Sequence, residues 1–264
     1  MPARKRSASR RPARQRPSRA RRAAGELWLY GSHAVAGALA NPARAPERLV
    51  MTDEARRRLP DMASRGAARG VRVETATAEA VAALLPPGAV HQGVALLAAP
   101  LAAPDLAEAC RPGLDGRSLV VVLDQVTDPR NLGAVLRSAA AFGVRAVVVQ
   151  DRNSPPESGA LAKAASGAVD LVPMVRVTNL SRALESLAGL GYWRIGLDSG
   201  AGAALDGSTE GTAVALVLGA EGAGLRRLTA EHCDASARLV TALDAPASLN
   251  VSVAAALSMY EMRR

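Results

Sequence analysis

The sequence SLVVVLDQVTDPRNLGAVLRSAAAFGV, from Ser118 to Val144, decides the fold. Its first part, Leu119 to Leu123, is a run of five apolar residues, which is typical of a strand buried on both faces. After a turn composition, Asn131 stands where a side-chain oxygen would cap a helix whose apolar residues recur with helical period. The stretch therefore predicts a buried strand followed by a helix that packs on the same sheet.

Arg137 lies off the apolar stripe of that predicted helix. Helical side chains lean toward the helix N-terminus, so we expect Arg137 to lie over Gly133, one turn earlier, where no side chain would block it. Asn131 and Arg137 would then share the helix start at the carboxyl end of a buried strand, where open α/β sheets bind ligands. A capping asparagine and a solvated arginine would explain the same residues without a ligand.

Strands and helices alternate through residues 118–264, and this alternation predicts a parallel sheet with helices on both faces. The expected strands are 145–150, 171–175, 193–197 and 212–219, and the expected helices are 157–166, 179–190 and 226–232. A smaller α/β unit is expected over residues 26–101, with a helix capped by Ser32, strands at 48–52, 71–75 and 93–99, and helices at 54–69 and 78–85. Residues 102–117, with two prolines and one short helical piece, read as the linker between the two units.

The chain is basic because of its first 25 residues. Ten of its 33 Lys and Arg lie in Met1 to Gly25, which has no acidic residue, so the rest carries 23 basic residues against 24 acidic ones. With several Pro and Ser, this tail is too polar to fold and is typical of an arm that binds a polyanion through counterion release. A solubility tail, a misassigned start codon and an organelle transit peptide are the alternatives.

Composition narrows the remaining function classes. Cys110 and Cys233 are far apart in sequence, which favours a reducing compartment over a disulfide framework. No apolar run approaches the ~20 residues that span a bilayer, and no signal peptide is recognisable, so we expect a cytoplasmic protein. The three histidines lack the spacing of metal ligands, so we expect no metal.

Two further stretches place polar groups where a strand gives way to a helix. The strand ending at Leu218 is followed by Gly219, Glu221 and two more glycines, a composition that lets backbone approach a ligand closely. The order Gly-x-x-Gly-x-Gly after a late strand differs from the dinucleotide-binding fingerprint, and Glu221 disfavours a phosphate ligand. Near the C-terminus, Ser248 is expected to cap a helix, with Asn250 beside it.

DPRNLGAVLRSAAAFGV, LVLGAEGAGL and SLNVSVAAAL closely resemble motifs 1, 2 and 3 of the SpoU family of RNA ribose 2′-O-methyltransferases, in the SPOUT class. The resemblance covers residues 118–264. Residues 26–101, with YGSHAV and HQGVAL, resemble the small RNA-binding domain, similar to ribosomal protein L30e, of the bacterial 23S rRNA guanosine 2′-O-methyltransferase subgroup. The resemblance implies a trefoil knot, S-adenosylmethionine bound in that knot, and a homodimer.

The resemblance also implies roles for individual residues. Arg137 would be the motif 1 arginine that activates the ribose hydroxyl, with Asn131 as its partner, either as a base or as an electrostatic stabiliser. Glu221 would be the motif 2 carboxylate, and Ser248 and Asn250 the motif 3 polar pair. Backbone groups at Gly219, at Leu239 or Val240, and at Leu249 would hold the cofactor. The segment RLVTALDAPASLN lacks the pattern common before motif 3, so the choice between Leu239 and Val240 stays open.

These features together predict an S-adenosylmethionine-dependent 2′-O-methyltransferase that acts on structured RNA, with a guanosine of 23S rRNA as the expected target. A tRNA 2′-O-methyltransferase and a noncatalytic RNA-binding relative are the alternatives. The modified nucleotide cannot be read from the protein sequence, because RNA recognition depends on loop shape and splayed bases.

Overall fold

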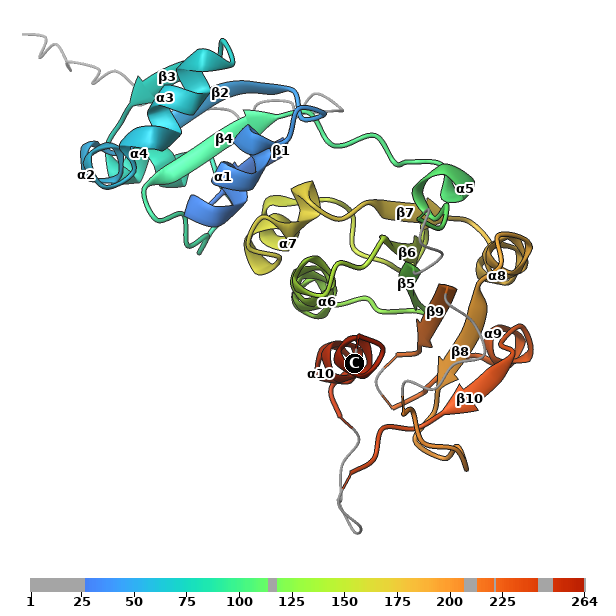
Figure 1. Cartoon of the computed structure of the whole chain (residues 1–264). Coiled ribbons are helices and arrows are strands. Elements are labelled where there is room, and N and C mark those ends of the chain that lie inside the picture. Colours follow the sequence, from blue (N-terminus) through green and yellow to red (C-terminus); the bar gives the residue numbers. More distant parts are fainter. Residues whose placement is uncertain (1–26, 114–117, 207–212, 221, 242–248, 264) are drawn as a thin grey trace, which may run out of the picture.

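The computed structural model describes residues 27–113, 118–206, 213–220, 222–241 and 249–263. The basic tail, Glu221 and Ser248 therefore lie outside the described residues. Two sheets organise the rest of the chain (Figure 1). The first has four strands and mixed direction, and the second has six parallel strands.

The N-terminal sheet has the strand order β1 (Leu27–Tyr30), β4 (Val94–Ala98), β2 (Pro46–Met51) and β3 (Arg72–Thr75). Helices α1 (Ser32–Ala40) and α3 (Pro60–Ala68) contribute to the core on one face, whereas α4 (Ala78–Ala83) packs on the other face through Val81. Helix α2 (Asp53–Arg58) precedes α3. The single helix expected at 54–69 is thus two helices, because Leu59 leaves helical geometry and Pro60 starts a new helix.

The C-terminal sheet has the strand order β10 (Ala235–Ala237), β8 (Trp193–Leu197), β9 (Ala213–Leu218), β5 (Ser118–Leu123), β6 (Ala146–Gln150) and β7 (Met174–Val177). Helices α6 (Pro129–Ala141), α7 (Gly159–Ala164) and α10 (Val251–Glu261) cover one face (Figure 1). The other face carries α5 (Leu106–Ala109), α8 (Leu180–Gly189) and α9 (Arg227–Glu231). This confirms the expected α/β fold with a parallel sheet covered on both sides.

Strand β5 packs into two hydrophobic cores, one on each face of the sheet, which explains the unbroken apolar run from Leu119 to Leu123. Val121 and Leu123 pack in the core beneath α6 and α10, whereas Val120 and Val122 pack in the core beneath α8. Each of these side chains is fully buried. Because alternate residues of a strand point to opposite faces, a polar residue anywhere in the run would be buried in one of the two cores.

Three expected helix caps are wrong. Helix α6 is capped by Asp128, whose carboxylate accepts from the Arg130 N–H, and Asn131 lies inside the first turn. Helix α10 begins after Asn250, which caps it in place of Ser248. Helix α1 begins at Ser32 itself, after Gly31 with φ of 87°. Serine, aspartate and asparagine are all good caps, so a stretch that holds several of them does not show which residue caps the helix.

The two sheet units pack directly on each other through a buried ion-pair cluster. The side chain of Arg44, from the N-terminal unit, is completely buried and pairs with Asp170 at 2.9 Å and Glu157 at 2.5 Å, both from the C-terminal unit. It also donates to the Ala99 carbonyl at 3.1 Å. Burial alone would lower the pKa of Arg44, but hydrogen bonds and charge attraction from the two carboxylates outweigh it and raise the pKa.

Glycines let the backbones of the two units touch. A Cβ on Gly37 of α1 would come within 2.9 Å of the Gly167 carbonyl oxygen, just before the 3-10 helix η1 (Ala168–Asp170). A Cβ on Gly159 of α7 would overlap the Trp28 carbonyl and the Tyr30 ring in β1. The hydrophobic core is continuous across this junction. The N-terminal unit is therefore held in a fixed position relative to the six-stranded sheet.

Candidate active site

The candidate site lies at the carboxyl ends of the neighbouring strands β5 and β9. These strands run parallel, and the Asp124 N–H donates to the Leu218 carbonyl at 2.8 Å, so their ends lie side by side. The segment after β5 leads into α6, and the segment after β9 is the glycine loop. Open α/β sheets bind ligands at this edge.

The glycine loop after β9 folds back onto itself. A Cβ on Gly219 would overlap the backbone of Gly224, and the Gly224 N–H donates to the Ala220 carbonyl at 3.0 Å. Gly222 and Gly224 have φ values of +77° and +65°, which side chains disfavour, and none of the described residues lies within 4 Å of the Cβ position of either glycine. The glycines therefore allow close contacts within the loop itself, whereas the ligand contact that we expected stays a prediction. The side of the loop with Gly222 and Gly224 faces none of the described residues.

Asp124 and Arg226 fix the base of this loop, although no sequence pattern singles them out. The Asp124 side chain is completely buried and accepts from the Arg226 guanidinium at 2.8 Å and from the Arg226 backbone N–H at 3.2 Å. The next residue, Gln125, has φ of 58°, a left-handed conformation that costs a non-glycine residue about 1–2 kcal/mol. A lone aspartate after a strand reads as a turn residue, so its ion pair with a residue about a hundred positions later has no sequence signal.

The structure brings together the predicted site residues Asn131 and Asn250. The Asn250 amide donates to the Asn131 side-chain oxygen at 3.1 Å, across the contact between α10 and α6. The Asn250 side-chain oxygen meanwhile accepts from the backbone N–H of Ser252 at 2.9 Å and from the Ser252 hydroxyl at 2.6 Å. Figure 1 shows α6 and α10 side by side on the same face of the sheet. The first and third motifs thus meet at one point.

Arg137 is exposed on α6, but the expected reason for its position is wrong. Gly133 lies on the buried side of α6, and a Cβ there would meet Ala164 of α7 at 2.5 Å. The space over Gly133 is therefore taken by a neighbouring helix and is not left for Arg137. The described residues form no hydrogen bond or ion pair with the Arg137 side chain, so its guanidinium is available to a ligand.

The predicted cofactor-binding positions differ in exposure. Leu239 packs partly against the core, whereas Val240 is 72% exposed and Leu249 is 38% exposed. Residues 242–248, between these two exposed side chains, lie outside the described residues. Exposed apolar side chains cost free energy in water and suit the faces of an aromatic ring, so these positions and the open glycine loop fit an adenosine-containing cofactor.

The charge balance at the start of α6 is set by a neighbouring pair. A hydrogen bond from Arg130 holds the pKa of Asp128 below its usual range and likewise raises the pKa of Arg130.

The cysteines are not activated, because burial raises the pKa of both Cys110 and Cys233 to about 11. Among the described residues, no cluster of His, Cys, Asp and Glu could hold a metal ion, and none of the helices there is long and apolar enough to cross a membrane.

Solved structures with the same fold are known. The chain aligns with an AdoMet-bound rRNA methyltransferase from Sinorhizobium meliloti at a TM-score of 0.75 and 23% identity, covering 91% of this chain and 88% of the other. It aligns with the SpoU methyltransferase AviRb from Streptomyces viridochromogenes, in complex with AdoMet, at a TM-score of 0.74 and 23% identity, covering 91% and 90% of the two chains. These two likenesses show that the chain shares the fold of both structures.

Family models match both parts of the chain. The model of the SpoU rRNA Methylase family matches residues 118–260, and the model described as RNA 2′-O ribose methyltransferase substrate binding matches residues 28–104. The chain therefore belongs to the SpoU rRNA methylase family. It is 41% identical over 241 residues to the 23S rRNA (guanosine-2′-O-)-methyltransferase RlmB of Xanthomonas campestris pv. campestris, covering 90% of this chain and 96% of that protein.

Proposed function

We propose that this protein transfers a methyl group from S-adenosylmethionine to the ribose 2′-hydroxyl of a guanosine in 23S rRNA. The observation that carries the proposal is the contact between Asn131 and Asn250, at the same sheet edge as the glycine loop. The relatives that match over 90% of this chain are named for this reaction. The substrate-binding match at residues 28–104 supports an RNA substrate.

The residues have separable tasks in this proposal. S-adenosylmethionine supplies an electrophilic methyl group when bound, so the protein must orient the ribose hydroxyl and help it lose its proton. Arg137, whose guanidinium keeps its charge at neutral pH, stabilises the developing negative oxygen or a phosphate beside it. Asn131 and Asn250 hold the start of α6 against α10. Glu221 and Ser248 are proposed to contribute polar groups from segments outside the described residues.

We further propose that the cofactor contacts backbone groups at Gly219, near Leu239 or Val240, and at Leu249. The exposure of Val240 and Leu249 and the open side of the glycine loop support this placement. A trefoil knot in the C-terminal third, an L30e-like N-terminal unit and a cytoplasmic location are proposed on the family resemblance, and membership of the SpoU family supports these three. RNA contacts by the basic tail are proposed on its charge, because residues 1–25 hold ten basic residues and no acidic one.

A homodimer built on α10 is also proposed. This helix packs on α6 with one side and leaves an apolar stripe exposed on the other, made of Val253, Leu257 and Tyr260 with exposures of 46%, 44% and 50%. A two-fold interface uses one such patch twice. Light scattering should report a dimer for the full chain and a monomer for Leu257→Glu. Leu171→Glu, at an exposed leucine far from α10 in sequence, should leave the dimer intact.

The test of the proposed activity uses label transfer from S-adenosylmethionine to 23S rRNA transcripts, followed by mapping of the methylated nucleotide. Wild-type protein should methylate one guanosine ribose. Arg137→Ala should lose activity by about 10²-fold or more, the scale of a lost charge-stabilising group, while calorimetry shows unchanged S-adenosylmethionine binding. Wild-type turnover in Arg137→Ala would refute the assigned role, and methylation of tRNA in place of rRNA would refute the substrate.

A further inference from the structure

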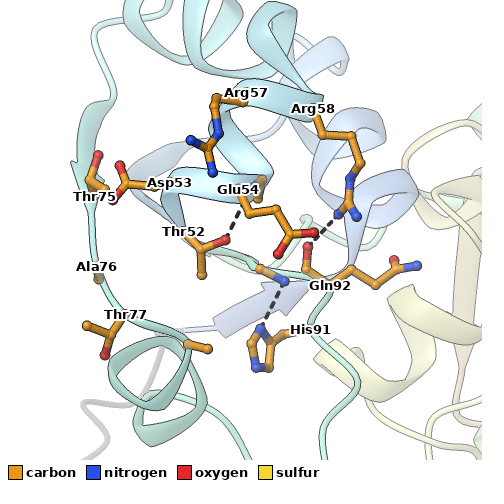
Figure 2. Close-up of a pocket in the computed structure, with 13 residues that line it drawn as sticks. Thr52, Asp53, Glu54, Arg57, Arg58, Thr75, Ala76, Thr77, His91 and Gln92 are labelled. Carbon is orange, nitrogen blue, oxygen red and sulfur yellow. Dashed lines mark hydrogen bonds between the residues drawn. The ribbon is translucent and has the colours of Figure 1, made fainter.

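A cavity of about 750 Å³ opens in the N-terminal unit, away from the candidate active site. Its walls come from the start of α2, from the turn between β3 and α4, and from the loop His91–Gln92–Gly93 before β4 (Figure 2). Small-molecule sites commonly have volumes of roughly 300–1,000 Å³, so the cavity is large enough for a nucleotide.

The loop that forms the floor of this cavity is held in an unusual conformation. Gln92 has φ of 56° without being glycine, which costs about 1–2 kcal/mol unless surrounding contacts compensate. A Cβ on the following Gly93 would collide with the Thr52 side chain, so this turn packs directly on the start of α2. The Gln92 carbonyl accepts from Arg58 of α2 at 2.9 Å. The floor of the cavity is therefore fixed from both sides.

The same loop is bonded to the C-terminal unit. The side-chain oxygen of Gln92 accepts from Lys163 of α7 at 2.6 Å, and it also accepts from the backbone N–H and hydroxyl of Ser32 at 3.1 and 3.2 Å. Burial lowers the pKa of Lys163 from its ordinary value. A ligand seated against this loop would thus rest on a floor whose position is fixed relative to the candidate active site.

The side chains around the cavity present both free donors and free acceptors. The described residues form no hydrogen bond or ion pair with Asp53, Glu54 or Arg57, three charged residues of α2 that line it. The His91 Nδ1 accepts from the Gly93 N–H at 3.1 Å, so the neutral imidazole carries its proton on Nε2 as another donor. Figure 2 shows the labelled side chains surrounding the cavity, with Arg57 and His91 at opposite ends.

This set of groups selects among ligands. The cavity lining carries two carboxylates, Asp53 and Glu54, and two guanidiniums, Arg57 and Arg58, so it has no excess of positive charge to attract a phosphate. The Watson–Crick edge of guanine has two donors, N1–H and the N2 amine, that suit a carboxylate, whereas O6 and N7 suit a guanidinium or an imidazole N–H. Adenine carries an acceptor at N1, which a carboxylate would repel. We propose that this cavity binds an unpaired guanine base of the RNA substrate, at a nucleotide other than the one methylated.

This inference rests on the proposed RNA substrate and names a second point of recognition for it. The test uses full-length protein and fluorescein-labelled pentaribonucleotides in an anisotropy titration. UUGUU should bind about tenfold more tightly than UUAUU, the discrimination expected from one bidentate contact, and the inosine analogue UUIUU should lie between them. The basic tail contacts phosphates that all three probes share, so it does not produce the difference.

Variants locate the preference. The double variant Asp53→Asn and Glu54→Gln keeps the size of both side chains and should reduce the preference for UUGUU over UUAUU to less than about twofold, because the carboxylates are lost. Glu47→Gln removes an exposed carboxylate outside the cavity and should keep the tenfold preference. Thermal melts of the variants should match the wild type within a few degrees, which separates lost recognition from lost folding.

Equal binding of UUGUU and UUAUU by the wild type would overturn the inference, and so would a preference that survives in the double variant. Methyl transfer to 23S rRNA transcripts is measured in parallel. Intact methylation without a guanine preference refutes the cavity alone. A carboxylate-dependent guanine preference without methylation of any rRNA transcript supports the cavity and refutes the proposed function.

Discussion

Asn250 combines a structural task and a site task in one side chain. Its oxygen caps α10, and its amide nitrogen reaches Asn131 on another helix. Caps are abundant at helix starts and usually mean nothing more than local stability. Here the second contact is what links two motifs that are far apart in the sequence, so the two tasks should be separable by substitution.

Asn250→Ser should keep the cap but lose the reach to Asn131. We expect its free energy of unfolding to stay within about 0.5 kcal/mol of wild type, whereas Asn250→Ala should lose about 1 kcal/mol. Methyl transfer should fall in both variants to a similar extent, by about tenfold, the scale of one hydrogen bond of 1–1.5 kcal/mol. Urea titrations and label transfer measure the two effects. Full activity in Asn250→Ser would show that the contact with Asn131 is not needed.

Single residues also mark the limit of what the sequence could predict about the site. Asn131 and Asn250 were expected at one sheet edge and do lie in contact. Asp124 was passed over, because its partner Arg226 comes from the segment after β9, which is next to β5 only in the folded sheet. Gly133 was misread for a related reason: a glycine on a helix shows that space is needed, but not which neighbour takes it.

At the scale of elements, the long buried strands were predictable, whereas two short strands, β1 and β10, were not. β9 is apolar throughout, and β5 and β6 are apolar except for one terminal residue each, Ser118 and Gln150. Helices cover both faces of the sheet that these strands form. Strand β10 is Ala-Ser-Ala, which has no strand pattern of its own and exists because it pairs with β8. Strand β1 is four residues long and ends just before Gly31, so its sequence shows no clear period. It too depends on its partner β4.

The glycine loop after β9 offers a matched pair of substitutions. Gly219→Ala would drive a methyl group into the backbone of Gly224, so the loop must move, and we expect a loss of about 2–3 kcal/mol in stability and at least tenfold in S-adenosylmethionine affinity. Gly222→Ala meets no neighbour in the part of the chain that the structure describes, and it carries a positive-φ penalty of about 1–2 kcal/mol. Calorimetry with S-adenosylmethionine distinguishes them. Equal affinities in the two variants would contradict the packing argument.

Strand β10 is fastened to β8 by an ion pair with a defined pH response. Asp234 accepts from the Arg194 side chain at 2.6 and 2.8 Å and from its backbone N–H at 2.8 Å. The hydrogen bonds from Arg194 hold the pKa of Asp234 below its ordinary value, against the opposing effect of burial. Its contribution to stability is therefore present above the ordinary aspartate pKa of about 3.9 and is lost as the pH falls through the lowered value.

Asp234→Asn should accordingly destabilise the protein by about 1–2 kcal/mol at neutral pH, the range for charge-assisted bonds at a partly exposed site. The difference from wild type should shrink as the solution is acidified below the ordinary aspartate range. Urea titrations over a pH series measure it, with Asp61→Asn, an exposed aspartate on α3, as the control. A difference that stays constant down to the lowest pH at which both proteins fold would exclude the ion pair as its source.

At the scale of the whole molecule, the Arg44 cluster decides whether the two units unfold together. Arg44→Met would leave Asp170 and Glu157 buried without their cation, which costs about 3–5 kcal/mol. The triple variant with Asp170→Asn and Glu157→Gln removes the stranded charges and should recover most of that loss. We expect differential scanning calorimetry to show one transition in wild type and a separate, earlier transition in Arg44→Met. An unchanged single transition in Arg44→Met would mean that the glycine contacts and the shared apolar core hold the units together without the ion pairs.

The strand order of the larger sheet has a consequence during protein synthesis. All four strands of the N-terminal sheet have been synthesised once Ala98 is added, so this sheet can form early. Strand β8 does not pair with β5. It is connected to β5 only through β9, and β9 is synthesised later than β8. A nascent chain that stops before Ala213 therefore holds β5, β6 and β7 ready to pair while the inner edge of β5 stays open. An open, apolar strand edge can pair with other chains, so the chain is most exposed to aggregation during this interval.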